Sequence, residues 1–332
     1  MELLDDVVIR NDSALLTVIE PTTANFDPIG WARSHRGAIR SLLTRRRALL
    51  LRDFAVPSRT VFGAVVSALG HPIDYVFRST PRKSLGRKIY SATEYPREYE
   101  IPLHCENAYQ AQWPLLLSFY CEQPAQSGGE TPLADMACVT RDLDPTACRA
   151  LIEKGVLYVR NYHPGMDLPW EEVFQTNSRA KVMAHCKTND IECRWSPDGV
   201  LRTEQVRPAI ATHPTTGQSV WFNQAHLFHI SSLDGGVRQS LQKMFSEEDL
   251  PRNAFYGDGS PIEVEVLEHI REVFRSHKTV FAWRKGDILI VDNMAVAHGR
   301  NTYTGSRSIA VMMADRNLAS DMSPPATRGW QS

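Results

Sequence analysis

The sequence predicts a mainly β fold with helical decoration, most naturally a jelly roll, built as a single domain over residues 1–332. Many short apolar runs of strand length are separated by turn residues, and only a few segments have the periodicity of helices. No internal repeat, low-complexity tract or linker interrupts the chain. A jelly roll fits this pattern because its two facing sheets bring strands that are distant in sequence to one mouth.

The first hundred residues are predicted to alternate strands, helices and one long loop. Apolar runs and helical periodicity predict a strand at 15–20, a helix at 34–47, a buried strand at 48–52 and a helix at about 59–69. Residues 73–100 are polar and rich in Arg, Lys, Ser, Thr and Tyr. Such a segment is either a lid over a substrate site or a plain surface connection, and the residues leave both open.

Beyond residue 100 the predicted strands outnumber the predicted helices. Strands are expected at 101–107, 115–121, 131–135, 156–162, 201–206, 208–213, 219–223, 287–292 and 307–314. Helices are expected at 144–154, where Asp144 and Pro145 begin and Gly155 ends the pattern, around 170–188, near 236–247 and at 262–274.

Charge and cysteine content exclude several classes of partner. The net charge of −1 argues against a nucleic acid or an anionic membrane as the main partner. No apolar run approaches the roughly 18 residues that a membrane helix needs. The six cysteines form no C-x-x-C pair, and the chain begins without a signal-peptide pattern. We therefore expect reduced thiols in a cytoplasmic protein.

A candidate metal site centres on the segment Ile101–Asn107. In a strand, residues i and i+2 point to the same face, so His104 and Glu106 would project into one space. His298, far along the chain, is the best candidate for a third ligand. Two histidines and one carboxylate with open positions are the ligand set of non-haem Fe(II) oxygenases. On its own an H-x-E pattern arises often by chance, and a lone strand histidine is more often structural.

Arg307 strengthens the candidate site. It stands at the start of the apolar run Ser308–Met312, and an arginine that enters a buried strand needs an anionic partner. Its planar fork matches a carboxylate, such as the distal carboxylate of a keto-acid cosubstrate. The alternative is a salt bridge to a neighbouring Asp or Glu.

Several motifs together carry a family resemblance. They are His104-Cys105-Glu106, the run Gly128–Asp135, the run Trp221–Gln224, and the run Asp292–Arg300 followed by Arg307. The chain resembles the taurine dioxygenase and clavaminate synthase-like branch of Fe(II)/2-oxoglutarate oxygenases. The stretches Arg78–Arg82 and Trp221–His229 look most like those of members that hydroxylate amino-acid units in nonribosomal peptide and related natural-product pathways.

The resemblance implies a double-stranded β-helix with His104, Glu106 and His298 as catalytic iron ligands. Thr131 would hydrogen-bond the distal carboxylate of 2-oxoglutarate beside Arg307, although an ordinary strand threonine is the alternative. The implied reaction consumes O2, converts 2-oxoglutarate to succinate and CO2, and hydroxylates an unactivated carbon. The implied partner is a small amino-acid-like substrate, either free or presented by a peptidyl carrier protein.

Two features refine the expectation about the substrate. Several relatives that hold a substrate acid group carry a second arginine four residues after the cosubstrate arginine, whereas this chain has Val311 there. The substrate's charges would then be met elsewhere, by Arg78, Arg82, Arg87 or Lys88 in the 73–100 segment. Halogenating relatives replace the carboxylate ligand with a small residue, so the presence of Glu106 favours hydroxylation or another oxidation.

The remaining polar residues have less specific interpretations. His226 and His229 are better explained as residues that line or buttress the site than as a second metal pair, since no carboxylate or cysteine stands nearby. Asn223 is a candidate substrate contact, and Asp292 is expected to be a turn or supporting residue. Desaturation or ring formation, a non-oxidative cupin-like metalloenzyme and a non-catalytic binding protein remain as alternatives.

Overall fold

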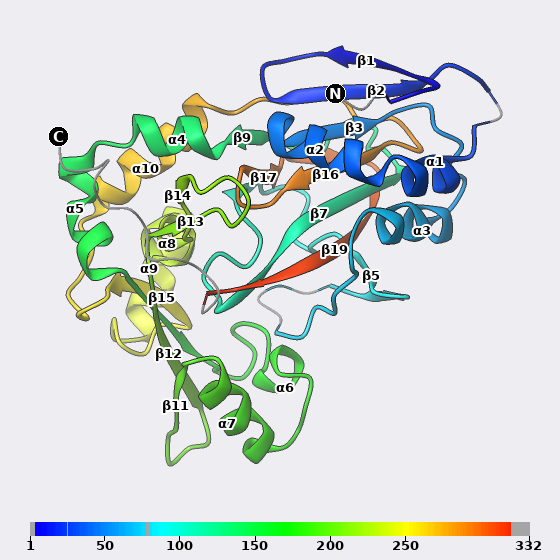
Figure 1. The fold of residues 1–332 in the computed structure, drawn as a ribbon. Helices are drawn as coiled ribbons and strands as arrows, with labels where there is room; N and C mark the ends of the chain where they lie inside the picture. Colours follow the sequence, from blue (N-terminus) through cyan, green and yellow to red (C-terminus); the bar gives the residue numbers. More distant parts are fainter. Residues whose placement is uncertain (1–3, 25, 78–79, 81, 320–332) are drawn as a thin grey trace.

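The computed structural model describes residues 4–24, 26–77, 80 and 82–319. At its centre is an eight-stranded sheet in the order β1-β2-β3-β16-β7-β19-β5-β4. The two longest strands, β7 (Gln112–Gln123) and β19 (Ser308–Leu318), are antiparallel neighbours and cross the middle of the molecule (Figure 1). The others are β1 (Val7–Asn11), β2 (Leu16–Pro21), β3 (Ala48–Leu51), β4 (Ser84–Gly86), β5 (Ile89–Ser91) and β16 (Ile288–Asp292).

Smaller sheets surround this centre. A three-stranded sheet in the order β6-β17-β9 contains β6 (Ile101–His104), β17 (Val296–Arg300) and β9 (Leu133–Asp135). A four-stranded sheet in the order β11-β12-β10-β15 contains β11 (Glu192–Trp195), β12 (Leu201–Arg207), β10 (Val156–Asn161) and β15 (Arg252–Tyr256). Two further pairs are β13 (Ile210–Thr212) with β14 (Ser219–Trp221), and β8 (Ser127–Gly128) with β18 (Tyr303–Thr304).

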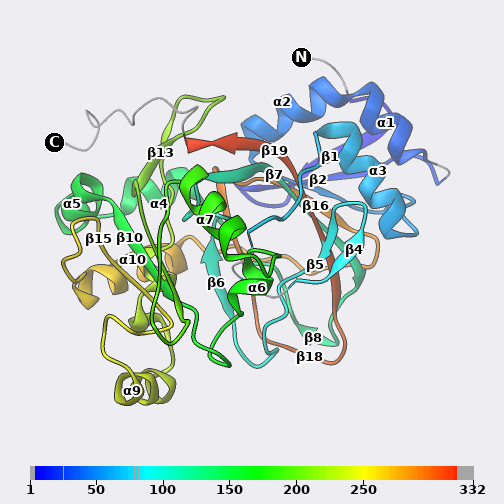
Figure 2. The same cartoon turned by 90° about the horizontal axis from the view of Figure 1, so that it is seen from below.

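Helices lie in two separate groups. The N-terminal group is α1 (Pro28–Ser34), α2 (Arg36–Arg46) and α3 (Arg59–Leu69), which lie together beside the large sheet in both views (Figures 1 and 2). The others lie around the smaller sheets: α4 (Met136–Asp142), α5 (Pro145–Lys154), α6 (Trp170–Val173), α7 (Arg179–Thr188), α8 (Ala225–Phe228), the 3-10 helix η1 (Ile230–Ser232), α9 (Gly235–Met244) and α10 (Val264–Ser276).

Strand β16, in the interior of the large sheet, is buried on both faces. On β16, Ile288 and Ile290 join the core that the N-terminal helices cover, whereas Leu289 and Val291 join a second core on the opposite face. The second core includes Leu133 of β9 and Val296 of β17, both in the three-stranded sheet. This division follows from the alternation of side chains along a strand. As a result, the three-stranded sheet, which carries His104 and His298, packs against the large sheet.

The structure has the expected combination of sheets with helices packed against them, and most predicted elements are present. Helix α5 begins where Asp144 accepts a hydrogen bond from the backbone of Thr146, and it ends at Gly155, whose φ is 79°. The run predicted as a buried strand is β3, and all four of its residues are buried. No helix in the described ranges is long and apolar enough to cross a membrane. All six cysteines are described, and none forms a disulfide.

Three predicted elements differ from the structure. The 170–188 helix is wrong, since Gln175 has a φ of 52° and Ser178 caps a new helix, α7. The 73–100 segment is not wholly irregular, because β4 and β5 form a hairpin that pairs with β19. The predicted strand 101–107 ends at His104.

Candidate metal and cosubstrate site

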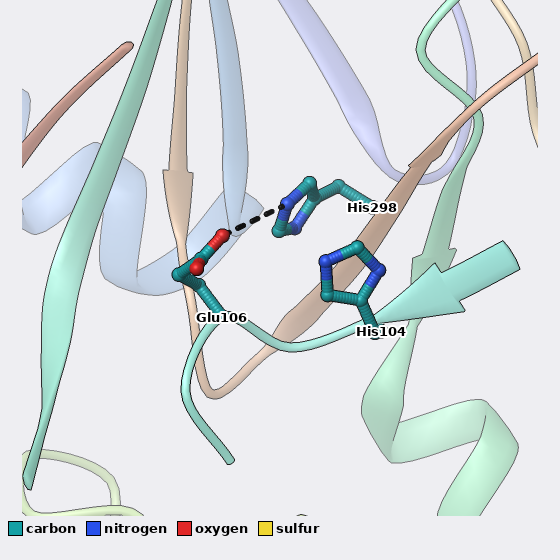
Figure 3. A group of neighbouring side chains, drawn as sticks. All are labelled: His104, Glu106 and His298. Atoms are coloured by element: carbon teal, nitrogen blue, oxygen red, sulfur yellow. Dashed lines mark ion pairs between the residues drawn. The ribbon is translucent and has the colours of Figure 1, made fainter. Parts of the chain in front are cut away.

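Three side chains with metal-ligand chemistry meet on and beside the three-stranded sheet (Figure 3). His104 ends β6, Glu106 lies in the turn that follows, and His298 is the middle residue of β17. One candidate ligand atom from each residue lies within 4.8 Å of the others. In the part of the chain that the structure describes, this is the single group of three or more His, Cys, Asp or Glu residues with that property.

Strand pairing brings the two histidines together. His104 and His298 are direct partners in the antiparallel register of β6 and β17, and their ring centroids are 4.5 Å apart. Next to them, Gly299 lies so close to β6 that a Cβ would stand 2.5 Å from the carbonyl oxygen of Ile101. The absence of a side chain at this position therefore permits the close approach of the two strands.

Glu106 reaches the site from a turn, so the predicted strand geometry is wrong. The strand ends at His104, and Asn107 has a φ of 59°, in the left-handed region that Asn adopts more readily than most residues. The turn still directs the carboxylate towards His298, whose Nε2 lies 3.8 Å from Oε2 of Glu106. Figure 3 shows the carboxylate and the two rings facing one another.

Asn293 fixes the backbone of Glu106, a role that the sequence analysis missed. Its Oδ1 accepts a hydrogen bond of 2.7 Å from the backbone N–H of Glu106, and its Nδ2 donates to the carbonyl oxygens of Glu106 and Pro114. Asn293 is 0% exposed. It was visible only as part of the Asp292–Arg300 motif, since nothing in the sequence pairs it with Glu106.

Arg82 lies at the site, not in a solvated lid. Its Nη2 donates a hydrogen bond of 2.6 Å to Oε2 of Glu106, and each of the two side chains is 4% exposed. The guanidinium also lies over the ring of Tyr75, 5.2 Å from its centroid. Burial opposes the charge of Arg82, but the attraction of Glu106 outweighs it and raises the pKa of this arginine.

His104 and His298 both have lowered pKa values, which favours the neutral imidazole. Burial is the main cause that lowers the pKa of His104, and it lowers the pKa of His298 well below the usual value. The Nδ1 of His104 lies 2.8 Å from the carbonyl oxygen of Pro102. Because a carbonyl can only accept, Nδ1 carries the proton and Nε2 keeps its lone pair. Neutral imidazole is the form that binds metals.

Arg307 and Thr131 line one small cavity with His104, His298 and Arg82. The Nε of Arg307 donates to the carbonyl oxygen of Gly129 at 2.9 Å, and burial, assisted by Arg300, lowers the pKa of Arg307 to about 10. Among the described residues no carboxylate is within ion-pair distance of Arg307. The alternative of an internal salt bridge is therefore not supported.

Thr131 is oriented by a residue that the sequence analysis missed. The indole Nε1 of Trp283 donates a hydrogen bond of 3.1 Å to the hydroxyl oxygen of Thr131, which is 2% exposed. Because an indole N–H can only donate, Thr131 accepts from Trp283 and keeps its own proton for another acceptor. An acceptor in the cavity, beside Arg307, fits this arrangement.

The other candidate substrate residues lie in different places. Arg78 lies outside the described residues. Arg87 and Lys88 form the turn between β4 and β5, where both have positive φ, and Lys88 pairs with Asp74. Val311, which occupies the position of the second arginine in some relatives, lines the small cavity.

The remaining polar candidates make contacts within the protein. Asn223 donates to the carbonyl oxygen of Ala209 and accepts from the backbone of Ala225, and its substrate role stays a prediction. His226 lies 3.1 Å from the carbonyl oxygen of Leu103 on β6, so it buttresses the strand of His104.

Two further residues also have local partners. His229 bonds Ser231 through Nδ1. Asp292 is the last residue of β16; its carboxylate accepts hydrogen bonds from the backbone of Met294 and Ala295 in the turn that follows, and it lies 2.8 Å from Nε2 of His213.

Comparison with known proteins indicates that the chain is a dioxygenase. The family model "Taurine catabolism dioxygenase TauD, TfdA family" matches residues 15–313, which is most of the chain. The chain belongs to this TauD/TfdA family. The predicted resemblance and the prediction of an oxygenase are confirmed.

Individual relatives agree with this family. The dapdiamide synthesis protein DdaC of Enterobacter agglomerans is 41% identical over 278 residues, which cover 83% of this chain and 84% of DdaC. A clavaminate synthase-like protein of Arabidopsis thaliana is 29% identical over 281 residues, which cover 81% of this chain and 82% of that protein.

A solved structure shows the same fold at low sequence identity. PvcB from Pseudomonas aeruginosa superimposes with a TM-score of 0.55 at 15% identity, covering 93% of this chain and 91% of PvcB. PvcB is described as an Fe, alpha-ketoglutarate-dependent oxygenase from an isonitrile synthetic pathway.

Proposed function

We propose that this protein is an Fe(II)- and 2-oxoglutarate-dependent oxygenase that hydroxylates an unactivated carbon of an amino-acid-derived substrate. The observation that carries the proposal is the meeting of His104, Glu106 and His298 beside a cavity that Arg307 and Thr131 line. We further propose that the large sheet and the three-stranded sheet are the two walls of a jelly roll, the double-stranded β-helix, in one domain.

The donor set fits Fe(II). Two imidazoles and one carboxylate on one side of an ion, with open positions opposite, are typical of non-haem iron oxygenases. The lowered pKa values of His104 and His298 keep both rings neutral, so neither has to lose a proton before it binds the metal at neutral pH. In PvcB the described cofactors are the same, iron and alpha-ketoglutarate.

The residues that line the small cavity suit a carboxylate of 2-oxoglutarate. Arg307 keeps its charge at neutral pH, because its pKa is about 10, and it lacks an internal carboxylate partner among the described residues. Its guanidinium and the hydroxyl proton of Thr131 together would hold the distal carboxylate of the cosubstrate. When bound, iron with 2-oxoglutarate and O2 supplies the oxidation of an unactivated C–H bond, with succinate and CO2 as by-products.

The protein's own residues hold the ligands and keep water out. Asn293 fixes the turn of Glu106, strand pairing fixes His104 against His298, and Trp283 orients Thr131. The ring of Phe119 lies 5.1 Å from that of His298 and covers it from the large sheet. A buried and preorganised arrangement of this kind strengthens electrostatic interactions and excludes solvent.

The substrate class follows from the relatives. DdaC is named for dapdiamide synthesis, so a substrate that carries an amino-acid unit in a natural-product pathway is the first class to test. It could be free or presented by a carrier protein, and the same residues are compatible with desaturation or cyclisation. A non-oxidative metalloenzyme is less favoured, because it gives Arg307 and Thr131 no anionic ligand to hold.

An anaerobic titration tests the proposal. Fe(II) and then 2-oxoglutarate are added to the protein without O2, and the weak visible charge-transfer band of the chelate is recorded. We expect the band in the natural protein, its loss in His298→Ala, and a much higher 2-oxoglutarate requirement in Arg307→Ala. Zinc binding with no band in any condition would contradict the proposal and support the non-oxidative alternative.

A further inference from the structure

We propose that Arg82 binds a second carboxylate besides that of Glu106, namely the carboxylate next to the keto group of 2-oxoglutarate. This inference rests on the proposed function and adds a cosubstrate-binding residue to it. The first observation is that the guanidinium of Arg82 is only partly satisfied. Nη2 donates to Glu106, whereas Nε and Nη1 are buried and have no hydrogen-bond partner among the described residues.

Buried arginine N–H groups normally have acceptors. Arg52 provides a comparison within the same fold, because it too is buried and paired with a carboxylate. Its Nε and Nη2 donate to both oxygens of Asp287, and Nη2 also reaches the carbonyl oxygen of Ala282. Arg82 has a single hydrogen-bond acceptor in an equally buried position. Arg160 also has Nε and Nη1 without a partner among the described residues, but it does not line the cavity, so the place of Arg82 in the cavity is what favours a ligand there.

The second observation is the place of Arg82 in the small cavity. Arg82 and Arg307 both line it, together with His104 and His298. 2-Oxoglutarate has two carboxylates, and the proposed function assigns only the distal one, to Arg307 and Thr131. The other carboxylate lies at the end that chelates the metal, where the histidines and Arg82 stand. Two arginines in one cavity therefore match the two ends of a dicarboxylate.

The charges of the residues that line the cavity also favour an anionic ligand. Three arginines and no carboxylate are among its described lining residues. One of them, Arg300, is already engaged, since it donates to the carbonyl oxygens of Tyr95, Pro96 and Tyr99. Glu106 supplies one negative charge against Arg82 and Arg307. An anionic ligand would balance the remaining positive charge, and a dianion would also offset part of the charge of the metal.

A carboxylate of the substrate is the alternative ligand for Arg82. The chain has Val311 where some relatives have a second arginine for such an acid group, and Arg82, which lines the same cavity, is the alternative partner for a substrate carboxylate. The two sources differ in a measurable way. A cosubstrate contact changes the affinity for 2-oxo acids before any substrate is added, whereas a substrate contact does not.

The experiment compares two 2-oxo acids in four variants. 2-Oxoglutarate and 2-oxobutyrate, which lacks the distal carboxylate, are titrated anaerobically into Fe(II)-saturated protein, and the charge-transfer band gives each affinity. The variants are Arg82→Lys, Arg82→Gln, Arg307→Gln and Arg160→Lys. Arg82→Lys keeps a cation beside Glu106 but loses the fork of donors. Arg160→Lys makes the same change in a buried arginine that pairs with Asp167 and does not line the cavity.

We expect both Arg82 variants to bind 2-oxoglutarate and 2-oxobutyrate about 10- to 100-fold more weakly, the range for loss of a hydrogen bond to a charged group. Arg307→Gln should weaken the binding of 2-oxoglutarate alone, and Arg160→Lys should weaken the binding of neither acid. Cooperative thermal unfolding verifies that each variant is folded. If Arg82→Gln does not fold, Arg82→Lys alone decides.

Unchanged affinities for both acids in a folded Arg82→Lys protein would overturn the inference. If the KM of the substrate rose at the same time, the second carboxylate would be that of the substrate. If only the Fe(II) affinity fell, Arg82 would serve to orient Glu106 alone. No band in the natural protein would instead refute the proposed function, so the two failures are distinguishable.

Discussion

The side-chain amide of Asn293 hydrogen-bonds both backbone groups of Glu106, at 2.7 Å to its N–H and 2.9 Å to its carbonyl oxygen. These bonds join the end of β16 to the turn after β6, two segments that are far apart in the sequence. A glutamate outside regular secondary structure has no strand neighbours to fix its backbone. Asn293 supplies that constraint, and it does so from a fully buried position.

Replacing Asn293 should therefore lower both the free energy of unfolding and the affinity for the metal. Asn293→Ala removes a hydrogen bond from each of three backbone groups, and we expect a loss of about 3–5 kcal/mol in the free energy of unfolding, since each lost bond costs about 1–3 kcal/mol. Urea unfolding of the metal-free protein measures the loss. Asn177→Ala, at an exposed position, is the control and should change little. A nearly unchanged stability of the Asn293 variant would contradict the role described here.

The hydrogen bond from Trp283 to Thr131 leads to a second prediction. Trp283→Phe removes the indole donor but keeps an aromatic ring to pack against Phe281. The hydroxyl of Thr131 is then free to rotate, so we expect the affinity for 2-oxoglutarate to fall about 2- to 10-fold while Fe(II) affinity stays constant. The anaerobic charge-transfer titration measures both affinities. Equal losses for iron and cosubstrate would indicate general disruption and not positioning of Thr131.

Gly299 provides a test of the strand contact that joins the two histidines. In Gly299→Ala the new Cβ would meet the backbone oxygen of Ile101 at 2.5 Å, so β6 and β17 have to separate. We expect a loss of stability of about 1–3 kcal/mol, as for other overpacked sites. Fe(II) affinity should fall about tenfold or more, equivalent to at least about 1.4 kcal/mol, because His104 moves away from His298.

Gly235→Ala is the matched control for this change. Gly235 begins α9, its φ is not positive, and a Cβ there meets nothing within 4 Å. Alanine also favours a helix more than glycine does, so this variant should be as stable as the natural protein or slightly more stable. Calorimetric unfolding and an iron titration on both variants separate the steric effect from the mere loss of a glycine. Full Fe(II) affinity in Gly299→Ala would show that the spacing of the strands tolerates a side chain.

Much of the site could be predicted because its metal-binding residues lie in short, recognisable sequence motifs. His104, Glu106 and His298 carry recognisable neighbours, and they do meet within 4.8 Å. Local signals also located the helix caps, as at Asp144 and Gly155, where the preferred residues stand at the ends of a periodic run.

The details that the sequence could not provide are all non-local. Arg82 belongs to a polar segment that is typical of a solvated loop, yet it is buried because Glu106 and Tyr75 receive it. Trp283 and Thr131 are 152 residues apart, and no periodicity connects them. Strand β6 ends at His104, and Asn107 in the turn that follows has a positive φ. Asn tolerates this backbone conformation but does not require it, so the sequence alone does not predict the turn.

Buried histidines outside the ligand group make the metal-free protein sensitive to acid. Burial lowers the pKa of His226 and of His229 to about 4, from an ordinary value near 6.5. Between these two values the unfolded chain binds more protons than the folded protein does, so stability falls as the pH falls below about 6.5. At pH 5 each residue should have lost about 2 kcal/mol of stabilisation relative to pH 8.

Urea unfolding with a chelator present, at pH 8 and at pH 5, tests this pH dependence. His226→Gln can still donate to the carbonyl oxygen of Leu103 but does not titrate, so the decrease between the two pH values should shrink by about 2 kcal/mol. His71→Gln, at an exposed histidine, should leave the decrease as it is in the natural protein. The same decrease in both variants would mean that His226 is not kept neutral by burial. Acid sensitivity would then have to come from other titratable groups.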